Sequence, residues 1–119
     1  MLIDTHCHLA DPAYDPDRQA VLARAARAGV LGVVAIGETR EAALRALELA
    51  DRYPGVSATA GLHPHEASRW DGGYEAWLRR TLADPRVVAA GEMGLDYHYD
   101  HSPREAQRAA FDGQLALAA

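Results

Sequence analysis

The chain has 119 residues, of which 49% are hydrophobic, and a formal net charge of −5; all 12 basic residues are arginine. It shows no basic patch of the kind that holds duplex DNA by its backbone. The phosphates of a nucleic-acid substrate would therefore have to be bound by metal ions rather than by stripes of basic side chains. A single cysteine excludes an internal disulfide and is typical of a reducing cytosol, which predicts a cytoplasmic protein, and no apolar run predicts a membrane span.

Four strand-like runs alternate with four helical patterns along the chain. The strands are predicted at about residues 2–7, 31–36, 56–60 and 86–91. The second of these runs is apolar throughout, as in a strand that is covered on both faces. Parallel strands joined by crossover helices follow from such an alternation. The sequence therefore predicts an α/β fold built from four consecutive β–α units.

Each predicted helix has signals for its start, its end or its buried face. Asp15-Pro16 predicts the start of the first helix and Gly29 its end. Thr39 is predicted to cap the second helix, and a Ser-x-x-Glu capping box at Ser102 predicts the start of the fourth. The third helix carries a one-sided stripe of larger side chains at helical spacing: Tyr74, Trp77, Leu78, Thr81 and Leu82.

Three short segments follow the first, third and fourth predicted strands and carry histidines or a glutamate. They are residues 4–8, 61–65 and 91–97. In a barrel of parallel strands, the C-terminal ends of the strands converge on one mouth. Histidines and a carboxylate that meet at one point have the composition of a divalent-metal site.

His6 and His8 form the sharpest pair, because residues two apart on a strand share a face. Two ordinary histidines near an N-terminus are the alternative. Cys7 lies between them and points the other way, so we expect it to be a packed small residue rather than a ligand or nucleophile. Asp4 is compatible with a turn residue, a hydrogen-bonding partner or a residue that supports the metal ligands.

Glu92 follows the fourth strand and lies between Gly91 and Gly94, which allow close backbone approach. Its two oxygens could bridge two metal ions, whereas a plain turn glutamate is the alternative. His63 follows the third strand and is a candidate for contact with the substrate, with a loop histidine as the competing interpretation. Three further histidines are predicted to be solvated loop residues: His65, His98 and His101.

The three segments, together with Gln107, Phe111, Gln114 and Leu115 on the last helix, resemble the N-terminal part of TatD-type metal-dependent deoxyribonucleases, in the amidohydrolase-like group of barrel hydrolases. Met93 stands where that family usually has isoleucine. The resemblance implies a (β/α)8 TIM-type barrel, of which this chain would supply about the first four β–α units. It also implies metal ligation by His6, His8 and Glu92, and a position near the scissile phosphate for His63. Asp96 and Tyr97 would shape the substrate site.

The length is short for this fold, since a (β/α)8 barrel takes roughly 250 residues. The further ligands that the family carries on later strands, two histidines and an aspartate, have no counterpart here. We therefore expect residues 1–119 to be the N-terminal half of one hydrolase domain, inactive alone, with the general acid or base in the missing half.

The expected chemistry is phosphodiester hydrolysis by two divalent ions, with Glu92 and His63 as the catalytic groups present. The ligand set suits Zn, Mn or Mg and does not choose among them. The expected substrate is a DNA end or single-stranded DNA. Two alternatives are a hydrolase of amide or lactone bonds on the same barrel, against which the absence of a lysine to bridge the metals argues, and a non-catalytic half barrel that self-associates through its open sheet edges.

Overall fold

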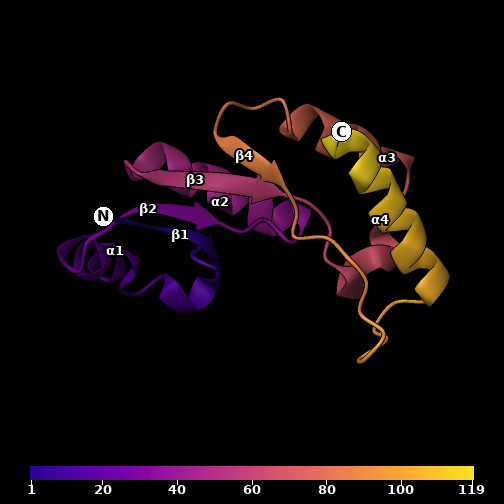
Figure 1. Ribbon diagram of the computed structural model, residues 1–119, viewed down its shortest axis with the longest axis horizontal. Helices are drawn as coiled ribbons and strands as arrows, with labels where there is room; N and C mark the ends of the chain where they lie inside the picture. The colour runs from indigo at the N-terminus through magenta and orange to yellow at the C-terminus, as the bar shows by residue number, and fades with distance from the viewer.

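Four parallel strands form one sheet in the order β1-β2-β3-β4, which is also their order along the chain (Figure 1). The computed structural model describes residues 1–119, and its strands are β1 (Leu2–Cys7), β2 (Val30–Ala35), β3 (Val56–Ala60) and β4 (Val87–Ala90). All four predicted strands agree with these bounds to within one residue. The predicted α/β fold with a parallel sheet is therefore confirmed, and the sheet corresponds to part of a barrel whose two edges are β1 and β4.

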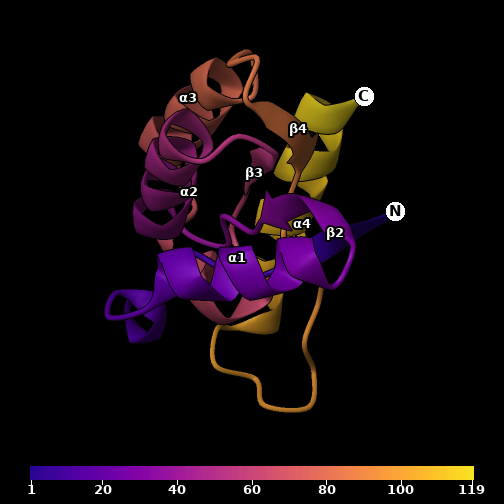
Figure 2. The same cartoon turned by 90° about the vertical axis from the view of Figure 1, so that its left-hand side faces the viewer.

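Four helices and two short 3-10 segments connect and flank the strands: α1 (Arg18–Arg27), α2 (Arg40–Arg52), α3 (Gly72–Thr81), α4 (Arg104–Ala118), η1 (Pro12–Tyr14) and η2 (Pro64–Arg69). Helices α3 and α4 lie at the end of the molecule opposite α1 (Figure 1). The segment between β4 and α4 loops out from the body of the chain (Figure 2). None of the helices combines the length and the apolar character that a membrane crossing requires.

Two of the predicted helix signals are confirmed and two are wrong. Thr39 accepts a hydrogen bond from the Ala42 amide at the start of α2, and Gly29 follows α1 with a φ of +93°. Asp15 does not cap α1, which begins at Arg18; its carboxylate instead pairs with the Arg18 guanidinium at 2.7 Å.

The predicted capping box at Ser102 does not form either, because Pro103 occupies the cap position of α4. The buried Ser102 hydroxyl donates to the His65 carbonyl at 2.7 Å and accepts from the Ser68 amide at 3.2 Å. Ser102 thus joins η2 to the start of α4, since a buried hydroxyl must satisfy its hydrogen bonds wherever partners lie.

The core consists of two apolar clusters on the sheet. One lies between the sheet and α2 and consists of Leu9, Ala10, Val33, Ala35, Ala46, Leu47, Leu49, Val56 and Ala58. The other joins the end of β3 to η2, α3 and α4 and consists of Ala43, Ala60, Leu62, Ala67, Tyr74, Leu78 and Ala110. The second cluster fixes the chain on both sides of His63, so it positions one of the predicted site residues.

Candidate functional site

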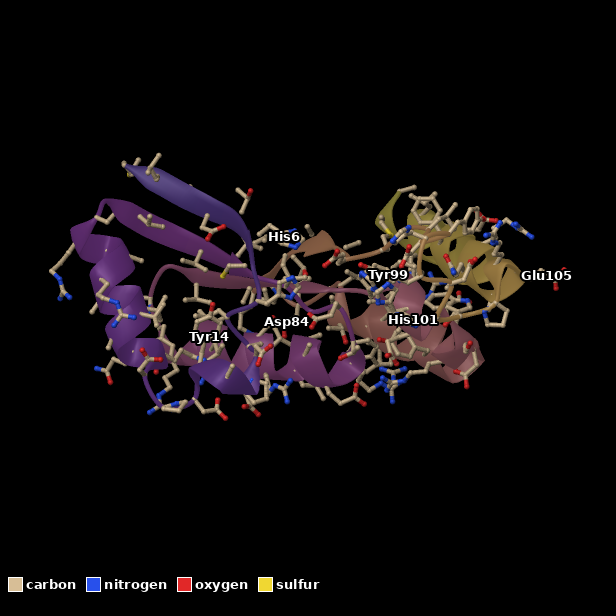
Figure 3. All side chains as sticks on the ribbon, turned by 90° about the horizontal axis from the view of Figure 1, so that it is seen from below. His6, Tyr14, Asp84, Tyr99, His101 and Glu105 are labelled. Carbon is tan, nitrogen blue, oxygen red and sulfur yellow. The ribbon has the colours of Figure 1, made fainter.

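The side chains of His6, His8 and Glu92 gather at one end of the sheet. The Nε2 atoms of His6 and His8 lie 3.5 and 3.9 Å from Oε2 of Glu92, and donor atoms of all three residues lie within 4.8 Å of one another. His6 belongs to β1 and is labelled in Figure 3, whereas Glu92 follows β4. The structure therefore brings together the three residues that the sequence analysis selected as metal ligands.

This meeting depends on the curvature of the sheet, because β1 and β4 are its two edges. Neighbouring strands are about 4.8 Å apart, so the edges of a flat four-stranded sheet would be about 14 Å apart. The 3.5 Å separation of His6 and Glu92 shows that the ends of the edge strands and their side chains turn inward toward a common point. A barrel-like curl of the sheet is thus what assembles the site.

Two glycines let the ends of β3 and β4 come together beside Glu92. The position of a Cβ atom on Gly61 would be only 2.6 Å from the Cα atom of Gly91, so a larger residue has no room there. Gly91 itself has a φ of +131°, a conformation that L side chains rarely adopt. The amide of Gly91 donates to the Ala60 carbonyl at 2.8 Å, which fixes the approach of Glu92 to the site.

Glu38 is a member of the site that the sequence analysis missed. One of its carboxylate oxygens, Oε2, is buried without a hydrogen-bond partner and lies 3.6 Å from Nδ1 of His8. A histidine that ligates a metal through one ring nitrogen commonly donates its other N–H to a carboxylate, and Glu38 is placed to accept it. Glu38 follows β2 closely, just as Glu92 follows β4, and this was the available signal.

The distances among the donor atoms of His6, His8 and Glu92 are close to those that a single divalent ion requires. Ligand atoms about 2.0–2.2 Å from one ion must lie within about 4.4 Å of each other. Both imidazoles meet that limit against Glu92, and the three donor atoms together lie within 4.8 Å, so a shift of about 0.4 Å would bring all of them onto one ion. The orphaned Glu38 oxygen supplies a partner for the remaining nitrogen of His8. The residues present therefore fit a divalent metal ion with mixed nitrogen and oxygen ligands.

His63 contacts both Glu92 and the neighbouring His65. Its Nδ1 accepts a hydrogen bond from the His65 amide at 3.1 Å, and its Nε2 lies 3.6 Å from Oε1 of Glu92. Burial lowers the pKa of His63 below its ordinary value, although the charge of Glu92 opposes that effect. Because Nδ1 acts as an acceptor it carries no proton, so the proton of the ring resides on Nε2, directed toward Glu92.

His65 is not the solvated loop residue that the sequence predicted. Its Nε2 is hydrogen-bonded to Oδ2 of Asp96, and its ring packs at right angles to the ring of His63, with centroids 4.3 Å apart. The other Asp96 oxygen accepts from the amides of His98 and Tyr99 at 3.0 and 3.2 Å. Burial raises the pKa of Asp96, but the hydrogen bonds from His65 and from these two amides together lower it below its ordinary value. The Asp96 carboxylate is thus ionised, and it holds the β4–α4 loop in place by accepting these hydrogen bonds.

Two buried glutamines of α4 hold the loops that carry these residues. Gln114 accepts from the Leu62 amide at 2.7 Å and donates to the Leu62 carbonyl at 3.1 Å, immediately before His63. Gln107 accepts from the Asp96 amide at 2.7 Å and donates to the Asp96 carbonyl at 3.0 Å. Each amide side chain thus satisfies both backbone groups of one loop residue, which explains why glutamine occupies these two positions.

A pocket of about 420 Å³ extends from Glu92 and His63 toward the β4–α4 loop. Asp96 and Tyr99 are among its lining residues, whereas Tyr97 is not. The ring of Tyr97 instead lies under the guanidinium of Arg104, 4.5 Å from its carbon. Of the residues predicted to contact substrate, His63 and Asp96 therefore line the pocket, whereas Tyr97 lies outside its lining.

Known proteins share this sequence and this fold. The sequence model of the TatD related DNase family matches residues 3–119. The chain is 42% identical over 118 residues to the metal-dependent hydrolase YabD of Bacillus subtilis, and 42% identical over 118 residues to the 3'-5' ssDNA/RNA exonuclease TatD of Enterobacter lignolyticus. Each alignment covers 99% of this chain, but 46% and 45% of the respective relative.

Solved structures agree with the sequence comparison. The crystal structure of YJJV, a TatD homologue from Escherichia coli K12, superposes with a TM-score of 0.89 at 38% identity and covers 98% of this chain and 46% of its own. A TatD-family hydrolase from Entamoeba histolytica superposes with a TM-score of 0.88 at 26% identity over 98% of this chain and 45% of its own. The chain thus spans about half the length of the relatives it matches. With its family model matched from residue 3 to residue 119, the chain belongs to the TatD related DNase family.

Proposed function

We propose that residues 1–119 supply the first half of a barrel domain that hydrolyses phosphodiester bonds in a divalent-metal-dependent reaction. The observation that carries this proposal is the convergence of His6, His8 and Glu92 from the two edges of the sheet. Relatives named metal-dependent hydrolase and ssDNA/RNA exonuclease support both the metal and a nucleic-acid substrate. The same names favour phosphodiester over amide hydrolysis.

His6, His8 and Glu92 would hold the metal, with Glu92 placed to bridge two ions, and Glu38 would orient His8. When bound, one or two divalent ions supply Lewis acidity, neutralise phosphate charge and make a water molecule acidic enough to attack at neutral pH. The number of ions and the choice among Zn, Mn and Mg belong to the proposal. The chain itself offers no lysine, so its own contribution to phosphate binding must come from other donors.

His63 is the group of this chain best placed to contact the phosphate. Its Nε2–H is directed into the site, and its Nδ1 is engaged by the His65 amide. A neutral imidazole in this tautomer donates a hydrogen bond to a phosphoryl oxygen and does not remove a proton from water. The general acid or base would therefore lie outside these 119 residues, and the 119-residue chain alone should not turn over substrate. Asp96 acts on His63 indirectly, through its hydrogen bond to His65.

The substrate that fits this site is the end of a single-stranded nucleic acid. The net charge of −5 opposes binding of long duplex DNA along its backbone. A single-stranded end can reach a site at the mouth of a barrel without such contacts along its length. We include RNA as well as DNA, because a relative is named a 3'-5' ssDNA/RNA exonuclease.

The test is hydrolysis of a single-stranded oligonucleotide by the full-length protein, with and without chelator. Glu92→Gln keeps the shape of the side chain and removes its charge, so we expect a rate loss of at least about 100-fold together with weaker metal binding by calorimetry. Glu105→Gln is the matched control, since Glu105 is exposed in the first turn of α4, away from the site (Figure 3). Full activity in excess chelator, or a near-normal rate for Glu92→Gln, would refute the proposal.

A further inference from the structure

We propose that the pocket between His63 and Tyr99 binds the base of the terminal nucleotide by stacking, without regard to which base it is. This inference rests on the proposed function and names how the same site holds its substrate. The pocket has a volume of about 420 Å³, within the range of about 300–1,000 Å³ that small-ligand sites show. It begins at Glu92, so a group inside it would be adjacent to a phosphate at the metal centre.

The charge of the pocket selects a base over a phosphate. Glu92 and Asp96 both line it, and none of the nine lining residues is an arginine. With Glu92 committed to the metal, a second phosphate of the substrate would face the ionised Asp96 and no arginine. An uncharged aromatic ring meets no such repulsion, and the apolar side chains of Pro64, Met93 and Leu95 add contact surface.

Tyr99 and His65 line the pocket, and His101, which lies outside the lining, packs against both of their rings, so that the three rings form an aromatic platform. Tyr99 and His101 are parallel to within 2°, with ring centroids 5.6 Å apart, and they lie side by side in Figure 3. The ring of His65 meets both of them edge-on, at 5.9 and 4.6 Å. Within residues 1–119, Tyr99 nevertheless remains 65% exposed. A large aromatic side chain that is held in place by neighbours and still open to solvent has the properties of a stacking surface.

Two polar side chains of the pocket, Asp96 and His63, already have hydrogen-bond partners within the chain, which argues against base-specific contacts by these groups. Both oxygens of Asp96 accept hydrogen bonds, one from His65 and the other from two backbone amides. Nδ1 of His63 accepts the His65 amide. The edges of a base would thus find few free acceptors, whereas its face finds an aromatic ring. Stacking tolerates any base, because every base has such a face.

The experiment compares two single-stranded oligonucleotides that differ only in the terminal residue, one with a normal base and one abasic. In the full-length protein we expect Tyr99→Ala to raise KM for the normal end by about 10- to 100-fold with little change in kcat. The variant should not change KM for the abasic end, and Tyr99→Phe should retain the wild-type value. Tyr14→Ala, which removes a tyrosine on η1 far from the pocket, is the matched control (Figure 3).

A binding measurement keeps this test independent of turnover. A terminal 2-aminopurine should lose fluorescence on binding to the wild type, and Tyr99→Ala should abolish that quenching. Equal KM changes for normal and abasic ends would assign Tyr99 a merely structural role and overturn the proposal, as would quenching that persists in Tyr99→Ala. If the wild type hydrolyses neither oligonucleotide, the proposed function fails, and the fluorescence of the bound end still decides whether the base pocket exists.

Discussion

Gln114→Leu should be among the most destabilising single changes outside the metal ligands. The substitution replaces a side chain that is 1% exposed with an apolar one of similar size. It removes the hydrogen bonds to the amide and carbonyl of Leu62, a residue that is itself 1% exposed and has no water to replace them. The third bond, to the Ala110 carbonyl, matters less, because that carbonyl lies within α4 and has the helical backbone bond available.

The magnitude follows from the two backbone groups left without partners. An unsatisfied buried donor or acceptor costs about 1–3 kcal/mol, which gives about 2–6 kcal/mol for the pair. The greater apolar burial of leucine offsets part of this cost, so we expect a net loss of about 3 kcal/mol. Domains of this kind have unfolding free energies of about 5–15 kcal/mol, and a loss of this size would therefore be obvious.

Urea denaturation of the purified protein measures this free energy, and hydrogen exchange of the Leu62 amide reports the local cause. Gln19→Leu is the matched control, because it makes the same chemical change at an exposed position of α1 and should stay within about 0.5 kcal/mol of the wild type. A loss below about 1 kcal/mol for Gln114→Leu, or an unchanged exchange rate at Leu62, would refute the reasoning that this amide anchors the loop before His63.

Two further predictions concern the same end of the sheet. Gly61→Ala should lower the melting temperature, because its Cβ atom would lie 2.6 Å from the Cα atom of Gly91, whereas Gly72→Ala, which meets nothing within 4 Å, should be tolerated; equal melting temperatures would contradict this. Burial raises the pKa of Tyr74 to about 12, and its hydroxyl donates to the Gly61 carbonyl at 2.9 Å. The folded state therefore keeps this proton after the unfolded state, with its pKa near 10, has lost it, so stability should fall by about 2–3 kcal/mol between pH 10 and pH 12. In Tyr74→Phe, the free energy of unfolding measured between pH 10 and pH 12 should not show the part of the fall that Tyr74 causes. Identical pH profiles for the two proteins would contradict the attribution of this fall to Tyr74.

Local sequence patterns were enough to predict the four strands and the residues that come together at one end of the sheet. Apolar runs separated by helical patterns placed all four strands to within one residue, and the clearest of them is β2, whose sequence is apolar throughout. The position of His6, His8, His63 and Glu92 directly at or after strands was enough to predict their convergence, since parallel strands end at one edge of a sheet.

How those side chains are held in place depends on contacts that form only in the folded chain. Helix starts were mispredicted at Asp15 and Ser102, because each side chain found a partner other than the helix amides. Asp15 pairs with the guanidinium of Arg18, three residues later, and Ser102 bonds to residues of η2 that lie 34 and 37 residues earlier. The sequence predicted His65 to be a solvated loop histidine. In the structure its ring is hydrogen-bonded to Asp96, 31 residues later in the chain. The fold likewise brings Glu38 beside His8 and Tyr99 to the wall of the pocket. Local patterns encode propensity and burial, which depend on neighbours in sequence, whereas a hydrogen bond across 31 or 52 residues depends on the path of the whole chain.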